Sequence, residues 1–385
     1  MRKRIIIGHP RFGRGGSEPV AMWLVEALKD DHDVTVLTTA GWDLQELNAH
    51  CGTHVNGNQV TVRIAPVPWP ARRLDAAALR AACFQRFARM VAGEYDVRIS
   101  AYNLTDWGLP AVHFIADFSW HQRIRERLDP VAPGFIYRDS WLRRIYLDIA
   151  GRYQNLSGRD LLREDKIIAN SHWTAELMRK ACEVEVAAVV YPPVCGEFPK
   201  VTWQDRENAF AMIGRIAPEK RIEDAIAILE TVRQRGHAVQ LHLCGQIGND
   251  SYGRRIATLC RNHADWIVSE GFITGARKAE ILASCRYGIQ TRSAEPFGIS
   301  VAEMIRAGAI VFAPNDGGQA EILDHPSLLF SDRGEAVEAI SAALESAALQ
   351  DKLRMHLSVQ AKRFSAEQFV RDACRCLTAG TEVYV

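Results

Sequence analysis

Two glutamates with a fixed spacing flank what the sequence predicts to be a strand-to-helix junction. Glu295 follows an apolar strand and opens the turn E-P-F-G, and Glu303 lies eight positions further on, inside a predicted helix. The first turn of a helix has free backbone N–H groups and the positive end of the helix dipole, so this junction suits an anion such as phosphate. Glu303 can face the same site, where its carboxylate would accept hydrogen bonds from the vicinal hydroxyls of a ribose. The alternative is a surface helix with two solvated glutamates.

Two cations follow another predicted strand, A-F-A-M-I-G. Arg215 comes directly after this strand, and Lys220 lies five residues later in the sequence R-I-A-P-E-K. A leaving nucleoside diphosphate gains negative charge on its oxygens as the bond to the sugar breaks, and cations at the end of a strand can stabilise that charge. A solvated strand-to-helix loop is the alternative, and the pairing with the two downstream glutamates favours the anion site.

A glycine-rich stretch, G-R-G-G-S-E-P at 13–19, joins the first predicted strand to the first predicted helix. Ser17 can cap that helix, and Gly15 and Gly16 allow the backbone to approach a ligand closely. Glu18 stands where the third glycine of a dinucleotide fingerprint would be, and no Walker lysine-serine pair follows, so both of those motifs are excluded. A plain turn between strand and helix remains the alternative.

The elements that must position these groups alternate between strands and helices. Such alternation predicts parallel, doubly wound sheets, in which ligands bind outside the carboxyl ends of the strands. The strands are expected at 4–9, 33–39, 61–66, 97–102, 111–116, 166–171, 186–194, 241–245 and 266–274, and helices at 19–29, 75–92, 366–379 and, as a pair, 333–363. Pro192-Pro193 forbids regular continuation, so a domain boundary is predicted there.

Composition limits the class of protein. The chain has 385 residues, 48% of them hydrophobic, which predicts two soluble domains. The net charge of +1 gives no general attraction to nucleic acid. The nine cysteines include no C-x-x-C pair, the start of the chain has no signal-peptide pattern, and no window approaches the roughly 20 apolar residues of a membrane span. A reduced, cytoplasmic protein is expected.

Two stretches have the spacing of metal ligands. Asp31-His32-Asp33 forms a D-x-D pattern, but it falls in the predicted tight turn before the second strand. His50-Cys51 with His54 lies in a polar connection and lacks a second pair of ligands. A structural role is favoured for both, so no metal site is predicted.

The Gly-Arg and Pro-Glu-Lys motif at 214–220, together with the Glu, Pro-Phe-Gly, Glu pattern at 295–303, resembles the nucleotide-sugar site of retaining glycosyltransferases with the GT-B fold, family 4, also called glycosyl transferases group 1. The resemblance covers nearly the whole chain. It implies an α/β protein with two Rossmann-like, doubly wound parallel-sheet domains that face each other across a cleft. The acceptor would bind to domain 1–194 and the nucleotide sugar to domain 195–365, while 366–385 would form a helix that crosses back to the first domain.

The resemblance also implies roles for single residues. The segment V-H-F-I-A-D-F-S-W resembles the family's histidine strand, which presents an imidazole to the donor sugar, although a strand histidine can equally be a satisfied core residue. The implied catalytic residues are His113, Arg215, Lys220 and Glu295. The implied donor-binding residues are Gly15, Gly16, Arg215, Lys220, Phe272, Ile273, Glu295, Phe297, Gly298, Ile299, Ser300 and Glu303. No metal and no other cofactor is expected.

The predicted function is transfer of a hexose, with retention of configuration, from a nucleoside-diphosphate sugar to a glycan, a lipid-linked molecule or a small molecule, as in polysaccharide biosynthesis. A basic region with Arg123, Arg125 and Arg127, followed by an amphipathic helix from Trp141, could contact an anionic membrane at the cytoplasmic face. A helix packed on its own domain is the favoured explanation. The alternatives are a non-hydrolysing nucleotide-sugar epimerase, a nucleotide-dependent oxidoreductase, which the missing third glycine disfavours, and a non-catalytic sugar-binding protein.

Overall fold

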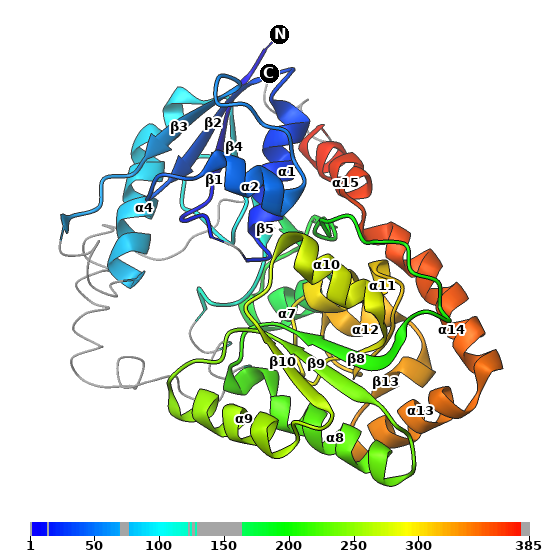
Figure 1. Ribbon diagram of the computed structural model, residues 1–385. Helices are drawn as coiled ribbons and strands as arrows, with labels where there is room; N and C mark the ends of the chain where they lie inside the picture. The colour runs from blue at the N-terminus through cyan, green and yellow to red at the C-terminus, as the bar shows by residue number, and fades with distance from the viewer. Residues whose placement is uncertain are drawn as a thin grey trace. The chain divides into compact units, whose positions relative to one another are not determined.

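The computed structural model describes residues 2–13, 15–69, 77–121, 124, 128 and 164–378 (Figure 1). The arginines at 123, 125 and 127 and the amphipathic helix predicted from Trp141 lie outside these residues. The chain divides into two compact units. Unit 1 comprises 1–170, 174–193 and 369–385, and unit 2 comprises 171–173 and 194–368.

Unit 1 is built on a seven-stranded sheet in which every neighbouring pair is parallel, in the order β3-β2-β1-β4-β5-β6-β7. The strands are β1 (Arg4–Gly8), β2 (Asp33–Thr38), β3 (Val60–Ile64), β4 (Val97–Ser100), β5 (Val112–Ile115), β6 (Lys166–Ala169) and β7 (Ala188–Val189). The helices are α1 (Glu18–Leu28), α2 (Leu44–Cys51), α4 (Ala77–Val91), α7 (His172–Cys182) and α15 (Ala366–Thr378), of which α7 begins within unit 2 and α15 passes into unit 1.

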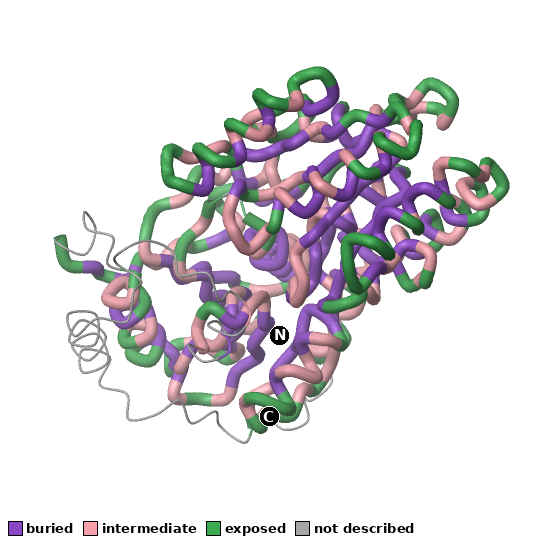
Figure 2. Tube along the Cα trace, turned by 90° about the horizontal axis from the view of Figure 1, so that it is seen from below, coloured by how far each residue is buried: buried purple, intermediate pink, exposed green. Residues whose placement is uncertain are grey.

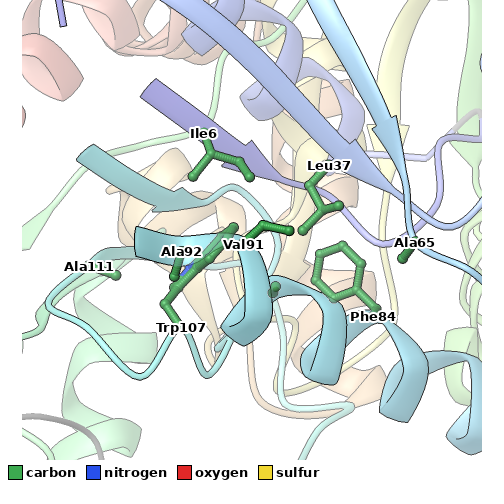
Figure 3. Packing of buried hydrophobic residues seen from close by; sticks show 9 residues of the cluster. Ile6, Leu37, Ala65, Phe84, Val91, Ala92, Trp107 and Ala111 are labelled. Atoms are coloured by element: carbon green, nitrogen blue, oxygen red, sulfur yellow. The ribbon is translucent and has the colours of Figure 1, made fainter. Parts of the chain in front are cut away.

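The core of unit 1 explains why its central strand is a continuous apolar run. Ile6 of β1 and Leu37 of β2 pack with Phe84 and Val91 of α4 and with the indole of Trp107 (Figure 3). The two isoleucines on either side of Ile6 are also buried, on the opposite face of the sheet. A strand that is covered on both faces reads as an uninterrupted hydrophobic sequence.

Unit 2 has a six-stranded parallel sheet in the order β10-β9-β8-β11-β12-β13. The strands are β8 (Glu207–Ile213), β9 (Gln240–Cys244), β10 (Ile267–Gly271), β11 (Cys285–Ile289), β12 (Ile310–Pro314) and β13 (Leu329–Phe330). The helices are α8 (Ile222–Gln234), α9 (Ser251–Asn262), α10 (Gly275–Ser284), α11 (Ile299–Arg306), α12 (Gly318–Leu323), α13 (Arg333–Glu345) and α14 (Ala347–Gln360). In Figure 1, α8 and α9 lie on one side of β8–β10, and α10, α11 and α12 on the other.

The predicted fold class is confirmed, because both sheets are parallel and strands alternate with helices. The last predicted strand of the first half, 186–194, is much shorter than expected, since β7 holds only Ala188–Val189. Pro192 and Pro193 cannot donate ladder hydrogen bonds, which limits this edge strand. Ser17 does not cap α1, contrary to prediction, because its hydroxyl contacts the side chains of His9 and Glu18 instead.

Buried residues follow the strands, and exposed ones lie on the loops and on the outer faces of the helices (Figure 2). All nine cysteines are free thiols. Burial raises the pKa of Cys244 and of Cys285 to about 12. Among the described helices, none is both long and apolar enough to cross a membrane.

Candidate functional site

The predicted junction after β11 holds a cluster of one carboxylate and two cations. The Lys220 Nζ atom lies 2.7 Å from the Glu295 Oε2 atom and donates a hydrogen bond to it. The Arg292 guanidinium lies 3.5 Å from the same oxygen. The side chains of all three residues are largely buried, with exposed fractions between 13% and 16%. The structure therefore brings two of the predicted catalytic residues, Lys220 and Glu295, into direct contact.

The charge state of Glu295 follows from this cluster. Burial alone would raise the pKa of the Glu295 carboxyl, because it penalises the charged form, but Lys220 and Arg292 outweigh that effect and hold the pKa below its usual value. Arg215 contributes in the same direction. Glu295 is thus an ionised carboxylate at neutral pH. It lies just before the N-terminus of α11, and the side chains of Lys220 and Arg292 hold it in place.

Arg215 lies at the edge of this cluster. Its side chain is 79% exposed, and its guanidinium is 3.0 Å from the carboxylate of Glu219. The loop that carries it begins at Gly214, with φ of 153°, and the Gly214 carbonyl oxygen would lie 2.2 Å from a Cβ atom added at Gly245. The end of this loop is bonded to the segment that follows β11, because the Thr291 hydroxyl donates to the carbonyl oxygens of Lys220 and Arg221.

The turn 296–300 presents the N-terminus of α11. Gly298 has φ of 103°, in the left-handed region that favours glycine, and a Cβ atom there would lie 3.0 Å from that of Gln319. Phe297 is buried, and the Ser300 hydroxyl accepts a hydrogen bond from the Gln290 amide. The first N–H groups of α11, at Ile299 and Ser300, belong to the helix end that attracts anions.

Glu303 lies one turn into α11 and is also held by a cation. The Lys278 Nζ atom, from α10, lies 2.6 Å from the Glu303 Oε1 atom, and both side chains are largely buried. Phe272 and Ile273 follow β10 immediately; Phe272 is 56% exposed, whereas Ile273 is half-buried. The predicted roles of these three residues toward ribose and base stay predictions.

The predicted residues of unit 1 have their own surroundings. His113, on β5, is fully buried; its Nδ1 atom accepts a hydrogen bond from the Thr105 N–H at 3.4 Å, and its Nε2 atom lies 3.6 Å from the Asp165 carboxylate. Gly15 and Gly16 are exposed, and a Cβ atom at Gly15 would lie 2.9 Å from the Glu18 carboxylate. Their roles toward the donor sugar also stay predictions.

Sequence reasoning missed four residues that build the cluster: Lys278, Thr291, Arg292 and Gln319. Lys278 and Thr291 contact Glu303 and the backbone of Lys220 from different segments. Arg292 contacts Glu295 from three residues earlier in the chain, and its carbonyl oxygen accepts a hydrogen bond from the Gln319 amide at 2.7 Å. Neither sequence spacing nor periodicity signals such pairs. An arginine three residues before Glu295 was the one sequence clue available.

The metal-like stretches have structural roles where the structure describes them. Asp33 begins β2 and pairs with Arg2 at 3.3 Å, and the His50 Nε2 atom lies 3.1 Å from the Gly15 carbonyl oxygen. Over the described ranges, no three His, Cys, Asp or Glu side chains lie close enough to hold a metal ion.

Comparisons with known proteins match the region that carries the cluster. Residues 196–364 match the model of the family described as Glycosyl transferases group 1. The GDP-Man:Man(3)GlcNAc(2)-PP-Dol alpha-1,2-mannosyltransferase of Xenopus laevis is 26% identical over 227 residues, which cover 53% of this chain and 46% of the relative. The match thus spans about half the length of that relative.

The solved structures described here match nearly the whole chain. The crystal structure of HepE from Anabaena in complex with UDP and glucose has a TM-score of 0.68 at 17% identity, covering 98% of this chain and 100% of that one. Sucrose-phosphate synthase of Thermosynechococcus elongatus has a TM-score of 0.70 at 15% identity, covering 99% and 100%. At these identities the likenesses show the fold alone. Residues 196–364 are therefore a domain of the glycosyl transferases group 1 family, in a chain with the GT-B fold of glycosyltransferases.

Proposed function

We propose that this protein is a retaining glycosyltransferase of family 4 that transfers a hexose from a nucleoside-diphosphate sugar to an acceptor, and that unit 2 binds the donor. The observation that carries the proposal is the cluster at the start of α11, where Lys220 and Arg292 converge on Glu295 inside the family-matched region. A diphosphate is an anion of the size that a helix N-terminus and adjacent cations bind.

In the reaction, the bond between the anomeric carbon and the diphosphate oxygen breaks, and its electron pair stays on that oxygen. Arg215, Lys220 and the N–H groups at the start of α11 stabilise the charge that develops there. The acceptor hydroxyl oxygen bonds to the anomeric carbon on the same face, and its proton passes to the departing phosphate. Glu303 holds the ribose, and Glu295 contacts the sugar.

Retention by front-face substitution agrees with the state of Glu295. A covalent mechanism needs a carboxylate whose electrons are available for attack on the anomeric carbon. Glu295 shares one oxygen with two cations, which makes it a poor nucleophile and suits it to hydrogen bonding with sugar hydroxyls. Following the anomeric proton of the product by NMR would test this part, and inverted configuration would contradict it.

The choice of donor is tested by binding. The Xenopus relative is named for GDP-mannose and the HepE structure contains UDP and glucose, so GDP-mannose and UDP-glucose are the first donors to compare, with an ADP-sugar as a third. A ligand that binds the folded state raises its stability by RT ln(1 + [L]/Kd), about 2.7 kcal/mol at a concentration of 100 Kd. We expect one donor to raise Tm and to be transferred; no shift with any nucleotide sugar would contradict the proposal.

The acceptor in the name of the curated relatives is a lipid-linked glycan, so this class is the first to test as acceptor, before free glycans. The proposal includes a reducing cytoplasmic location, supported by the nine free thiols, and, as a lesser part, a contact of unit 1 with the membrane surface.

The proposal also includes independence of the transfer reaction from metal ions. We expect transfer to continue in excess EDTA, and abolished activity that Mg²⁺ or Mn²⁺ restores would contradict this part.

A further inference from the structure

The segment 171–173, between β6 and α7, has no role in the proposed function, although its contacts set it apart from its neighbours. Ser171, His172 and Trp173 group with unit 2, whereas Asn170 before them and Thr174 after them group with unit 1. The chain therefore enters unit 2 for three residues, far in sequence from the rest of that unit. The hydrogen bonds of these three residues show which parts of unit 2 they hold.

Ser171 bonds directly to the turn that precedes α11. Its hydroxyl donates to the carbonyl oxygen of Pro296 over 2.6 Å, and Ser171 is fully buried. A hydroxyl-to-carbonyl hydrogen bond of this length is short, and a buried hydrogen bond is costly to remove. Pro296 lies between Glu295 and Phe297, so this bond fixes the peptide unit next to the carboxylate of the cluster.

His172 and Trp173 bond to the other side of the same assembly. Their backbone N–H groups, in the first turn of α7, donate to the carboxylate of Glu321 at 3.0 and 2.6 Å. The Trp173 indole N–H donates to the Asp316 carboxylate at 3.0 Å. Hydrogen bonds from a helix start to a carboxylate are charge-assisted, and this geometry fixes the segment tightly.

The two turns that the segment contacts are themselves in backbone contact. The Gly318 N–H donates to the Glu295 carbonyl oxygen at 2.8 Å. A Cβ atom at Gly317 would lie 2.5 Å from the Glu295 carbonyl oxygen, and one at Gly318 would lie 2.5 Å from that of Pro296. Side chains larger than hydrogen cannot fit there. The segment 171–173 thus bonds to both of the turns that contact each other. Ser171 bonds to Pro296 in the first turn, and Trp173 bonds to Asp316 beside the second.

We propose that Ser171 is a positioning residue for donor binding: its hydroxyl holds the Pro296 carbonyl so that the following N–H groups of α11 and the Glu295 carboxylate keep the orientation that the sugar diphosphate needs. This inference rests on the proposed function and extends it to a residue that carries no charge and does not touch the substrate. The bonds of Trp173 and Glu321 keep Ser171 in place.

The experiment compares Ser171→Ala, Ser171→Thr and a matched control, Ser341→Ala, by calorimetric affinity for bare UDP and GDP and by kcat and KM with the donor found active. Ser341 is a buried serine of α13 whose hydroxyl has no hydrogen-bond partner within the described residues. Loss of one buried hydrogen bond at the turn corresponds to about tenfold weaker binding. We expect Ser171→Ala to raise KM for the donor and Kd for the diphosphate by about this factor, with kcat falling less than about threefold.

Ser171→Thr keeps the hydroxyl and should restore the affinity, and Ser341→Ala should match wild type even if its Tm falls equally. Ser171→Ala with wild-type Kd and KM would overturn the inference, as would equal losses in Ser341→Ala. Should Ser171→Ala fail to fold, Trp173→Phe decides, because it removes the indole bond to Asp316 that helps to hold the segment of Ser171: weaker diphosphate binding supports the inference and unchanged binding overturns it. A wild-type protein that binds no nucleoside diphosphate would remove the proposed function itself, together with this inference, and that result is visible without any variant.

Discussion

Two strand-to-helix junctions, one in each unit, have opposite electrostatic character. The junction before α11 in unit 2 gathers Lys220 and Arg292 around a single carboxylate. The junction before α1 in unit 1 contains the buried carboxylate of Glu18, which accepts hydrogen bonds from the Gly13 N–H at 2.8 Å and from the Ser17 hydroxyl at 3.2 Å. In unit 1 the protein's own anion therefore occupies the place that a bound anion would take.

The difference shows that two junctions at helix starts can carry opposite charge. Next to Glu18 lies His9, which is buried, stacked on Phe12 at 4.4 Å between ring centroids, and bonded through Nε2 to the Ser17 hydroxyl at 3.2 Å. Burial lowers the pKa of His9 to about 4, against the opposing effect of Glu18, so the ring is neutral at pH 7. At the unit 1 junction the negative charge of Glu18 is thus not neutralised by His9. At the unit 2 junction, by contrast, the side chains of Lys220 and Arg292 are positively charged.

The largest effect is expected from removing a cation at the unit 2 junction. Lys220→Ala removes a charge-assisted hydrogen bond to Glu295 and a cation for the diphosphate, so kcat/KM should fall about a hundredfold, or about 3 kcal/mol. Arg215→Ala, at an exposed position, should cost about tenfold. Steady-state kinetics, with circular dichroism as a check of folding, would measure both. Near wild-type transfer by folded Lys220→Ala would refute the assignment of this junction to the donor.

The second prediction concerns His9 and the pH dependence of stability. The folded-state pKa of His9 lies below the unfolded value, so the unfolded chain binds the proton more readily; the resulting stability is fully present above about pH 6.5 and is lost as the pH falls toward 4. Between pH 7 and pH 5, His9 should lower the free energy of unfolding by about 2 kcal/mol. Urea unfolding at both pH values would measure the change.

His9→Gln, which stays uncharged and can still bond to Ser17, should remove this part of the pH dependence. His54→Gln, at an exposed histidine of the same unit, is the matched control and should leave the dependence as in wild type. An unaltered pH profile in His9→Gln would show that the ring of His9 is not held neutral by burial.

The smallest expected effect comes from neutralising one glutamate in each unit. Glu303→Gln replaces a charged acceptor by a neutral amide, so affinity for the bare nucleoside diphosphate should fall about tenfold, or about 1.4 kcal/mol. Glu18→Gln removes the negative charge of the unit 1 junction and should leave that affinity within about twofold while lowering Tm. Calorimetric titration of both variants makes the comparison. Equal losses of affinity would show that charge at the unit 1 junction also affects the donor.

The fold was predictable because both sheets are parallel and covered on their two faces, so that strands such as Ile5–Ile7 and Ile310–Pro314 appear as apolar runs separated by helices. Most element boundaries lie within two residues of the expected ones. Among the exceptions, β10 ends at Gly271, three residues early, and α2 was not expected. β7 is short for a reason that the sequence does contain, the proline pair at 192–193.

The site was predictable only in part. The motifs at 214–220 and 295–303 predicted Lys220 and Glu295, which the structure brings into contact, but the partners Lys278 and Ser171 come from segments with no sequence pattern of their own. Periodicity tells which face of an element is buried, whereas the meeting of two side chains from distant segments depends on three-dimensional packing. Glu18 shows the opposite case. The glycine-rich loop before α1 resembles a ligand-binding loop in sequence, but in the structure the Gly13 N–H of this loop donates to the protein's own Glu18 carboxylate.

The contacts that fix the turn 295–298 have a consequence for the entropy of binding. The turn is held by the Ser171 hydroxyl, the Gly318 N–H and the close approach of Gly317, all of which are contacts within the protein itself. Ordering the backbone of one residue costs about 1–2 kcal/mol, and a loop that becomes ordered on binding subtracts this cost from the affinity. Because these contacts already order the turn, a diphosphate bound at the start of α11 would not lose affinity to the ordering of this backbone.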